Sequence, residues 1–200
     1  MTSADSRYPF AIPSGWFAVA ESPDIEIGQT KAAYYFATHL VVWRDETGEA
    51  HVQDAFCPHL GAHLGHGGLV DGCDVVCPFH GWVYNLDGTL RGVAQPDSFG
   101  EMKREDFGLK PIEMELFHGF IFLRFHPGPQ PAIAQMLAPY DADFAAYGAG
   151  ALLPAATASW AAELPVNWKS VRDVDNEGYH VPLAHPSLQE LYGRDYRDLY

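Results

Sequence analysis

Two short Cys/His pairs constrain this chain more than any other feature of its sequence. Cys57 and His59, separated by one residue, lie in CPHLG, and Cys77 and His80, separated by two residues, lie in CPFHG. Seventeen residues separate the two pairs. Thiolates and imidazoles are strong metal ligands, and glycine-rich connections suit loops that carry ligands on a rigid scaffold. The pattern predicts a metal centre built from two loops that the fold must bring together.

The donor set favours an iron–sulfur cluster over a single ion. A Rieske-type [2Fe–2S] cluster takes two cysteine sulfurs on one iron and two histidine nitrogens on the other. Cys57 and Cys77 would hold the first iron, and His59 and His80 the second. A structural zinc ion on the same four residues is the alternative, although zinc sites more often pair their ligands through two to four intervening residues.

Other residues of the two loops are expected to support these ligands. Pro58 and Pro78 each follow a ligand cysteine and stiffen the loop. Several glycines would allow close backbone approach and offer N–H groups to the sulfurs, although ordinary turn glycines would look the same. For His63 and His66, which lie off the ligand spacing, we expect surface hydrogen bonding, and for Cys73 an ordinary buried or loop thiol. The loop glycines expected to allow this close backbone approach are Gly61, Gly65, Gly67, Gly68 and Gly81.

The sequence around the loops predicts a small antiparallel β domain. Short β-rich runs are separated by turn signals; they are GWFAVA, AAYYFATHLVVWR, HVQDAF, DVVC and GWVYNL. Thr47-Gly48 and Asp87-Gly88 are candidate hairpin turns. Residues 107–125 supply two further strands that turn at His118-Gly119. The Pro/Gly-rich stretch 126–131 is the clearest domain boundary.

Residues after this boundary have a mixed character. IAQMLAPYDADFAAYG is expected to be a helix interrupted near Pro139, and TASWAAELPVNW a strand that leads into a helix over about 167–179. SLQELYGRDYRDLY is again helical in pattern. This segment has too few strands for a sheet of its own and looks unfinished. The predicted organisation is a lead-in over 1–14, a β metal domain over 15–126 and the beginning of a second domain over 127–200.

The composition argues against several functional classes. Hydrophobic residues make up 48% of the chain, which is ample for a packed core. A formal charge of −14 argues against a nucleic-acid or anionic-membrane surface, although an acidic surface can steer a basic redox partner. No leader pattern and no apolar run of about 18 residues is present. We therefore expect a soluble, cytoplasmic protein.

In the form CPHLGAHLG…CPFHGWVYNLDG, the cluster region resembles the N-terminal domain of the Rieske-type non-haem iron oxygenases. It does not resemble the respiratory-chain Rieske protein, which carries an additional, disulfide-bonded cysteine in each loop where this chain has Ala62 and Phe79. The absence of that disulfide suggests a low potential within the Rieske range of about −150 to +300 mV. Such a cluster accepts electrons from NAD(P)H-fed carriers and passes them to iron and dioxygen.

A second motif extends the resemblance. Glu177, His180 and His185 match the D-x2-H-x4-H motif of the oxygenases' mononuclear iron site, and Asn167-Trp168-Lys169 lies at the family's usual distance upstream. Two imidazoles and a carboxylate form the facial triad of non-haem Fe(II) oxygenases. Glu177 and His180 would share a helix face, and Pro182 would interrupt that helix so that His185 lies beside His180. Helix-end histidines bonded to backbone carbonyls are the alternative.

Two departures from the family motif matter. Glu177 stands where the commoner residue is Asp; the resemblance implies that this carboxylate links a cluster histidine of one subunit to an iron histidine of its neighbour across a trimer interface. The resemblance also implies a third iron ligand, an Asp or Glu far downstream, which this chain does not reach. No motif selects the nearby carboxylates Glu190, Asp195 and Asp198. Asp173 and Asp175 are either acceptors for imidazole N–H groups or plain surface charge.

The sequence thus predicts an α+β chain: a small antiparallel β Rieske [2Fe–2S] domain and the start of a helix-grip-like catalytic domain, apparently truncated. The resemblance implies the alpha subunit of an oxygenase that uses NAD(P)H-derived electrons and O2 to hydroxylate or demethylate an organic substrate, aromatic or otherwise apolar. Leu183 and Leu188 near the second motif are compatible with such a substrate and equally with an ordinary core. Expected partners are a reductase, a ferredoxin and further subunits, as a homotrimer or an α/β hetero-oligomer. A Rieske electron carrier or sensor without oxygenase chemistry is the alternative.

Overall fold

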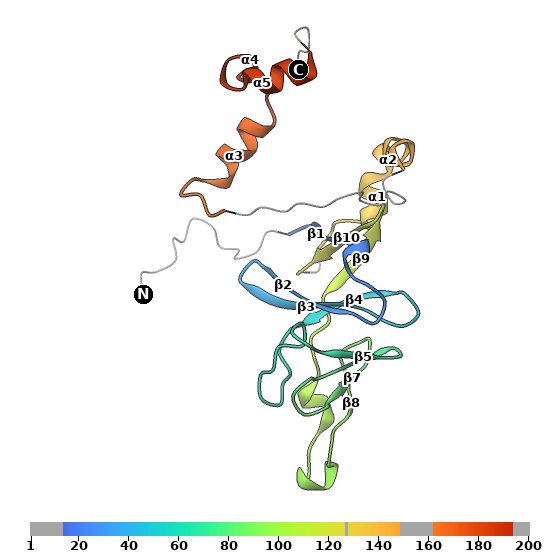
Figure 1. The fold of residues 1–200 in the computed structure, drawn as a ribbon. Helices are drawn as coiled ribbons and strands as arrows, with labels where there is room; N and C mark the ends of the chain where they lie inside the picture. Colours follow the sequence, from blue (N-terminus) through green and yellow to red (C-terminus); the bar gives the residue numbers. More distant parts are fainter. Residues whose placement is uncertain (1–13, 127, 149–161, 194–200) are drawn as a thin grey trace. The chain divides into compact units, whose positions relative to one another are not determined.

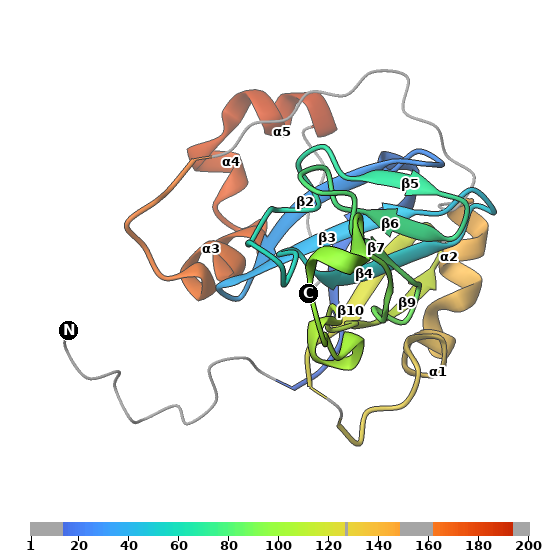
Figure 2. The same ribbon diagram turned by 90° about the horizontal axis from the view of Figure 1, so that it is seen from below.

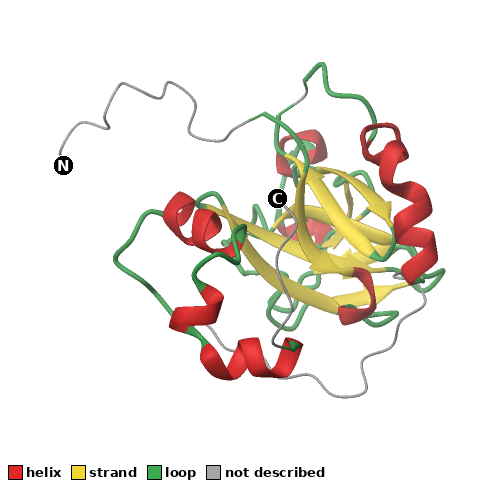
Figure 3. Cartoon of the chain, turned by 90° about the horizontal axis from the view of Figure 1, so that it is seen from above, coloured by secondary structure: helices red, strands yellow, loops and turns green. Residues whose placement is uncertain are grey.

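The computed structural model describes residues 14–126, 128–148 and 162–193 (Figure 1). Contacts divide the chain into two units, residues 1–153 and 154–200, each of which is described by itself. Strands, yellow in Figure 3, are the main regular structure of the first unit, and the regular structure in the described part of the second unit is helical. This division falls downstream of the boundary predicted at 126–131, and the predicted domain limits stay a prediction.

The strands of the first unit form three antiparallel sheets, which confirms the predicted antiparallel β domain. The first sheet has the order β1–β10–β9, with β1 at Phe17–Glu21, β10 at Phe120–Arg124 and β9 at Glu113–Phe117. The second has the order β2–β3–β4, at Thr30–Tyr35, Thr38–Arg44 and Ala50–Asp54. The third has the order β5–β6–β7–β8 (Figure 2), at Leu69–Asp71, Asp74–Val76, Val83–Tyr84 and Leu90–Gly92.

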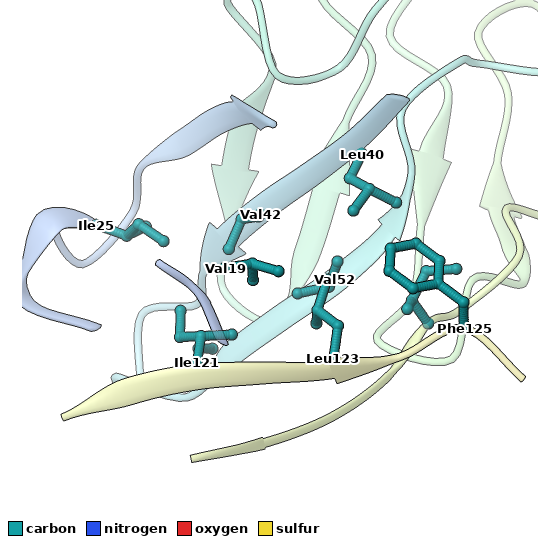
Figure 4. Packing of buried hydrophobic residues seen from close by; sticks show 10 residues of the cluster. Val19, Ile25, Leu40, Val42, Val52, Ile121, Leu123 and Phe125 are labelled. Carbon is teal, nitrogen blue, oxygen red and sulfur yellow. The ribbon is translucent and has the colours of Figure 1, made fainter. Parts of the chain in front are cut away.

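Strand β3 lies between two hydrophobic cores. Because side chains alternate between the faces of a strand, Leu40 and Val42 point into one core while Val41 and Trp43 point into the other. All four side chains are at most 2% exposed. The first core joins β3 and β4 to β1 and β10 (Figure 4). The second core joins β3 to the third sheet and includes both candidate ligand cysteines.

The predicted hairpin turns are confirmed. Thr47-Gly48 lies between β3 and β4, and Asp87-Gly88 lies between β7 and β8. Both glycines have positive φ, +94° at Gly48 and +85° at Gly88, a conformation that glycine adopts without steric penalty. Gly88 also packs so closely that a Cβ there would lie 2.0 Å from the Leu109 carbonyl oxygen. The turn at His118-Gly119 between β9 and β10 is likewise present.

The run AAYYFATHLVVWR, expected as one extended segment, is instead a hairpin. It breaks at Phe36-Ala37, which have φ of 51° and 58° and connect β2 to β3. A two-residue hairpin turn of type I′ needs positive φ at both central residues, which normally selects Asn or Gly. Here the Phe36 ring packs edge-on against Phe17 at 4.6 Å and Phe125 at 5.5 Å between centroids, which favours the turn despite its unfavourable sequence.

The helical predictions are largely confirmed. Helices α1 (Ile133–Leu137) and α2 (Asp141–Tyr147) of the first unit are separated by a 3₁₀ turn containing Pro139. The second unit contains α3 (Trp168–Asp175), α4 (Val181–Ala184) and α5 (Pro186–Tyr192). Most of the strand expected over 157–166 lies outside the described residues, and 162–166 form no strand. No helix in the described ranges is long and apolar enough to cross a membrane.

Candidate metal centres

The two ligand loops share one backbone design. In each C-P-x-x-G sequence, the glycine N–H donates to the cysteine carbonyl: Gly61 to Cys57 at 2.8 Å, and Gly81 to Cys77 at 3.0 Å. The cysteine N–H in turn donates to the carbonyl five residues later, at 2.9 Å in the first loop and 2.8 Å in the second. Both glycines have positive φ, +75° and +67°. These turns explain why glycine occupies the fifth position of each loop.

The structure pairs the four predicted cluster ligands by type, cysteine with cysteine and histidine with histidine. Cys57 and Cys77 are free thiols, both only 2% exposed, in the second core, and Cys77 lies close enough to Cys57 to raise the pKa of the Cys57 thiol. The rings of His59 and His80 lie 4.6 Å apart between centroids. His80 is exposed, whereas His59 is half-buried. Thiols beside thiols and imidazoles beside imidazoles are the pairing that a Rieske cluster requires.

The Cys57 thiol has a hydrogen-bond partner that the sequence did not suggest. Its sulfur lies 2.9 Å from the hydroxyl of Tyr84, which is fully buried. Burial raises the pKa of the Cys57 thiol, and nearby Cys77 acts in the same direction, while the bond to Tyr84 opposes them. The pKa of Tyr84 is also raised, by burial and by this bond, so its hydroxyl remains a donor.

His59 is held in place by aromatic contacts. Its ring stacks on Trp82, with centroids 4.5 Å apart and an interplanar angle of 6°, and Phe99 packs against it edge-on. A cavity of about 550 Å³ lies beside these rings, lined also by Met102, Phe107 and charged residues. The Nδ1 atom of His59 is buried and has no hydrogen-bond partner. A buried nitrogen without a partner fits a metal ligand, because buried polar atoms are otherwise nearly always hydrogen-bonded.

The predictions for the other residues of the two loops are confirmed in part. Close backbone approach is confirmed at Gly65, where a Cβ would lie 2.6 Å from the Ala32 Cα, and at Gly68, where it would lie 2.3 Å from the Leu64 carbonyl oxygen. Gly61 and Gly81, in contrast, donate their N–H groups to cysteine carbonyls rather than to sulfurs. His63 accepts a bond from the Gly65 N–H at 3.1 Å, and Cys73 is an exposed residue between β5 and β6.

In the second unit, Glu177 contacts His180 as predicted, but not on a helix face. Helix α3 ends at Asp175, two residues before Glu177, so the predicted helix to Tyr179 was too long. Gly178 lies in this break and is a poor helix former. Glu177 Oε1 lies 2.5 Å from His180 Nδ1, and Oε2 accepts the His180 backbone N–H at 3.3 Å. These bonds to His180 outweigh desolvation and lower the pKa of Glu177.

His185 lies beside His180, with ring centroids 5.3 Å apart. Helix α4 separates the two histidines: His180 precedes its first residue and His185 follows its last. Pro182 therefore lies in the first turn of a new helix, a favourable position for proline, rather than ending an old one. With Nδ1 of His180 bonded to Glu177, its Nε2 is left to face a metal.

A third donor does not join these histidines. Within residues 14–126, 128–148 and 162–193, no three His, Cys, Asp or Glu side chains converge on one ion position. Of the nearby carboxylates, Glu190 lines a separate cavity with Pro182 and Pro186, while Asp195 and Asp198 lie outside the described residues. Asp173 and Asp175 are exposed on α3, and the described part of the chain contains no bond from either to an imidazole.

Comparison with known families identifies both units. A model of the Rieske [2Fe-2S] domain matches residues 15–109, and a model of the ring hydroxylating alpha subunit (catalytic domain) matches residues 154–198. The chain belongs to the Rieske-type non-haem iron oxygenases. Its two domain types are those of a [2Fe–2S] cluster and of oxygenases that use mononuclear iron.

Individual relatives of this oxygenase family match only part of their own length. The chain is 45% identical over 84 residues to cholesterol 7-desaturase from Bombyx mori, covering 42% of this chain and 18% of the relative. It is 31% identical to the glycine betaine monooxygenase oxygenase subunit from Pseudomonas aeruginosa (strain UCBPP-PA14), covering 74% of this chain and 34% of the relative. The quaternary ammonium Rieske monooxygenase CntA in complex with L-carnitine has the same fold, with a TM-score of 0.73 and 23% identity over 88% of this chain and 50% of that one. The chain therefore spans about a third or less of these curated relatives.

Proposed function

We propose that this chain is the N-terminal part of the oxygenase component of a Rieske non-haem iron oxygenase, with a cluster held by Cys57, His59, Cys77 and His80. The observation that carries the proposal is the pairing of the four donors by type around a buried, unpartnered His59 Nδ1. The pair of thiols would take one iron and the pair of imidazoles the other. The cluster would supply one-electron transfer.

The second unit supports an iron site at His180 and His185. Both rings lie together at the ends of α4, and Glu177 fixes the tautomer of His180 by accepting from its Nδ1. We assign the third ligand to an acidic residue outside the described part of the chain. Bound Fe(II) would supply activation of dioxygen for insertion of oxygen into the substrate. We also assign to the Glu177 carboxylate a second hydrogen bond, with a cluster histidine of a neighbouring subunit.

The expected partners follow from this assignment. Electrons would come from an NAD(P)H-dependent reductase, directly or through a ferredoxin; carbazole 1,9a-dioxygenase, one structural neighbour, has been solved in complex with its ferredoxin. The net charge of −14 favours a donor with a basic docking surface. We also expect a homotrimer or an α/β hetero-oligomer, because the proposed hydrogen bond between Glu177 and a cluster histidine joins neighbouring subunits.

For the substrate, we propose a small organic compound rather than an aromatic one specifically. The relatives' names mention cholesterol, glycine betaine, carnitine and carbazole, which share no chemical class. These relatives therefore support oxygenase chemistry in general and give no preference for aromatic hydrocarbons. A carrier without oxygenase chemistry is disfavoured by the catalytic-domain match at 154–198.

Anaerobic preparation with iron and sulfide tests the cluster assignment. We expect a red-brown protein with a Rieske EPR signal and two cluster irons per chain. His59→Ala and His80→Ala should abolish the signal. His63→Ala is the matched control, because His63 lies in the same loop with its Nδ1 bonded to Gly65. A colourless wild-type protein, or a His63 variant as damaged as the His59 variant, would contradict the assignment.

A further inference from the structure

Gln53 of β4 is a wholly buried polar residue with no role in the metal centres described above. Its side chain is 0% exposed and lies on the strand that leads into the first ligand loop, four residues before Cys57. Its register partner is Val41, which belongs to the second core. An amide in this apolar layer is unfavourable unless its hydrogen-bonding groups are used.

The side-chain amide nitrogen of Gln53 donates two hydrogen bonds. Nε2 donates to the carbonyl oxygens of Asn85 at 3.0 Å and Leu86 at 2.9 Å. These two residues directly follow Tyr84 at the end of β7 and begin the turn to β8. Gln53 Oε1, in contrast, is buried without a partner. The side chain therefore retains an unsatisfied acceptor while its donor holds this hairpin.

The two bonds close a small ring of contacts around the ligand sulfur. Gln53 and Cys57 are connected by a few residues of the chain at the end of β4. Tyr84 and Asn85 are neighbours in the sequence. Gln53 is bonded to Asn85, and Cys57 is bonded to Tyr84. A shift of the hairpin at Asn85 would therefore move the Tyr84 hydroxyl relative to the sulfur.

We propose that Gln53 is a positioning residue that holds the β7–β8 hairpin so that the Tyr84 hydroxyl stays on the Cys57 sulfur, and that it thereby sets the reduction potential of the cluster. The proposal rests on the ligand assignment made above. A donor to a ligand sulfur stabilises the electron-rich reduced cluster more than the oxidised one. Loosening the hairpin weakens this donor and lowers the potential.

The test is a mutant cycle read by redox titration of the loaded protein. Gln53→Met keeps the volume and removes the amide, and Tyr84→Phe removes the hydroxyl. We expect Gln53→Met to lower the midpoint potential in the same direction as Tyr84→Phe and by less. In the double variant, the Gln53 substitution should cause no further shift, because the group through which it acts is gone.

Controls separate positioning from stability. Val42→Ala weakens the other core, so it should lower the melting temperature and leave the potential unchanged. Gln53→Asn, too short to reach both carbonyls, repeats the test if Gln53→Met does not fold. An unchanged potential in a loaded Gln53 variant would overturn the proposal, as would additive shifts in the double variant. Loss of the cluster in both Gln53 variants while Tyr84→Phe retains it would also overturn it. A wild-type protein that takes up no cluster would instead overturn the ligand assignment itself.

Discussion

The hydroxyl of Tyr84 contacts the sulfur of a proposed cluster ligand directly. It lies 2.9 Å from Cys57 Sγ in a fully buried environment. A neutral hydrogen bond contributes about 1 kcal/mol net, which corresponds to about 40 mV for a one-electron couple. We expect Tyr84→Phe to lower the midpoint potential by tens of millivolts, measured by EPR-monitored titration. Tyr35→Phe is the control, because its hydroxyl bonds only the Val19 carbonyl; an equal shift there would refute the interpretation.

The glycines of the two ligand turns give a second prediction. Gly81 has φ +67°, and although a Cβ there meets no atom within 4 Å, an L-residue in this conformation costs about 1–2 kcal/mol. Gly81→Ala should therefore reduce the free energy of unfolding by about that amount and reduce iron content per chain. Urea denaturation and iron analysis measure the two effects. Gly92→Ala, which would make only an ordinary contact with Val83, should change neither.

At this scale the sequence predicted which residues pair as candidate ligands but not the side chains that contact them. Two Cys/His pairs are recognisable because each ligand type has a fixed chemistry and spacing. Tyr84 and Gln53 act through positions set by strand register, which depends on contacts distant in the sequence. Tyr84 lies in the predicted β-rich run GWVYNL, but the run itself does not show which buried group its hydroxyl meets.

The hairpin between β3 and β4 is organised by a buried carboxylate. Asp45 is 1% exposed and accepts bonds from the Thr47 and Glu49 N–H groups and from His51. Burial alone would raise the pKa of Asp45, but the bonds from His51 and Thr47 outweigh it and lower the pKa to about 2. The hairpin therefore gains stability from an ionised carboxylate above the unfolded-state pKa of about 3.9.

A depressed pKa makes this stability depend on pH in a defined direction. It is fully present above about pH 4 and is lost as the pH falls toward about 2. Asp45→Asn should therefore reduce the free energy of unfolding by about 2 kcal/mol at neutral pH, and the difference from wild type should vanish near pH 2. Chemical denaturation of the metal-free protein at several pH values checks this. Asp71→Asn, at an exposed site of β5, is the control; a pH-independent Asp45→Asn deficit would contradict the explanation.

The sequence predicted most elements and missed those decided by packing. Turns marked by glycine, at 47–48 and 87–88, were found because glycine carries the conformational signal itself. The turn at Phe36-Ala37 was missed because aromatic packing, not turn chemistry, stabilises it. The end of α3 at Asp175 was placed too late because the helical spacing of Glu177 and His180 continued past Gly178.

At the scale of the whole molecule, the first unit contains all four residues proposed as cluster ligands. These residues and the buried residues of both hydrophobic cores lie between residues 19 and 125. A chain ended after Gly148 should therefore load the cluster and give the same EPR spectrum and midpoint potential as the 200-residue chain. Metal analysis and EPR on both chains make the comparison. Failure of the shorter chain to load would mean that the second unit contributes to the cluster site.

The described helices of the second unit, in contrast, do not form a packed core. These three helices contain no buried residue, and large side chains such as Trp168, Tyr179 and Leu183 are more than half exposed. The sequence predicted this unfinished character from its lack of strands, and the match of only residues 154–198 to a catalytic domain agrees with it. A third ligand for the proposed iron site was not predicted at any position of this chain, because no local spacing relates such a residue to the two histidines.

The burial of β3 on both faces affects how the first unit unfolds. A single strand contributes side chains to both cores, so loss of β3 opens both of them. Unfolding that removes β3 from the Val42 side therefore also opens the layer that contains Cys57 and Cys77. The visible absorbance of the cluster should therefore decrease along the same melting curve as the signal of the β-sheets. That absorbance then reports the unfolding of the entire first unit.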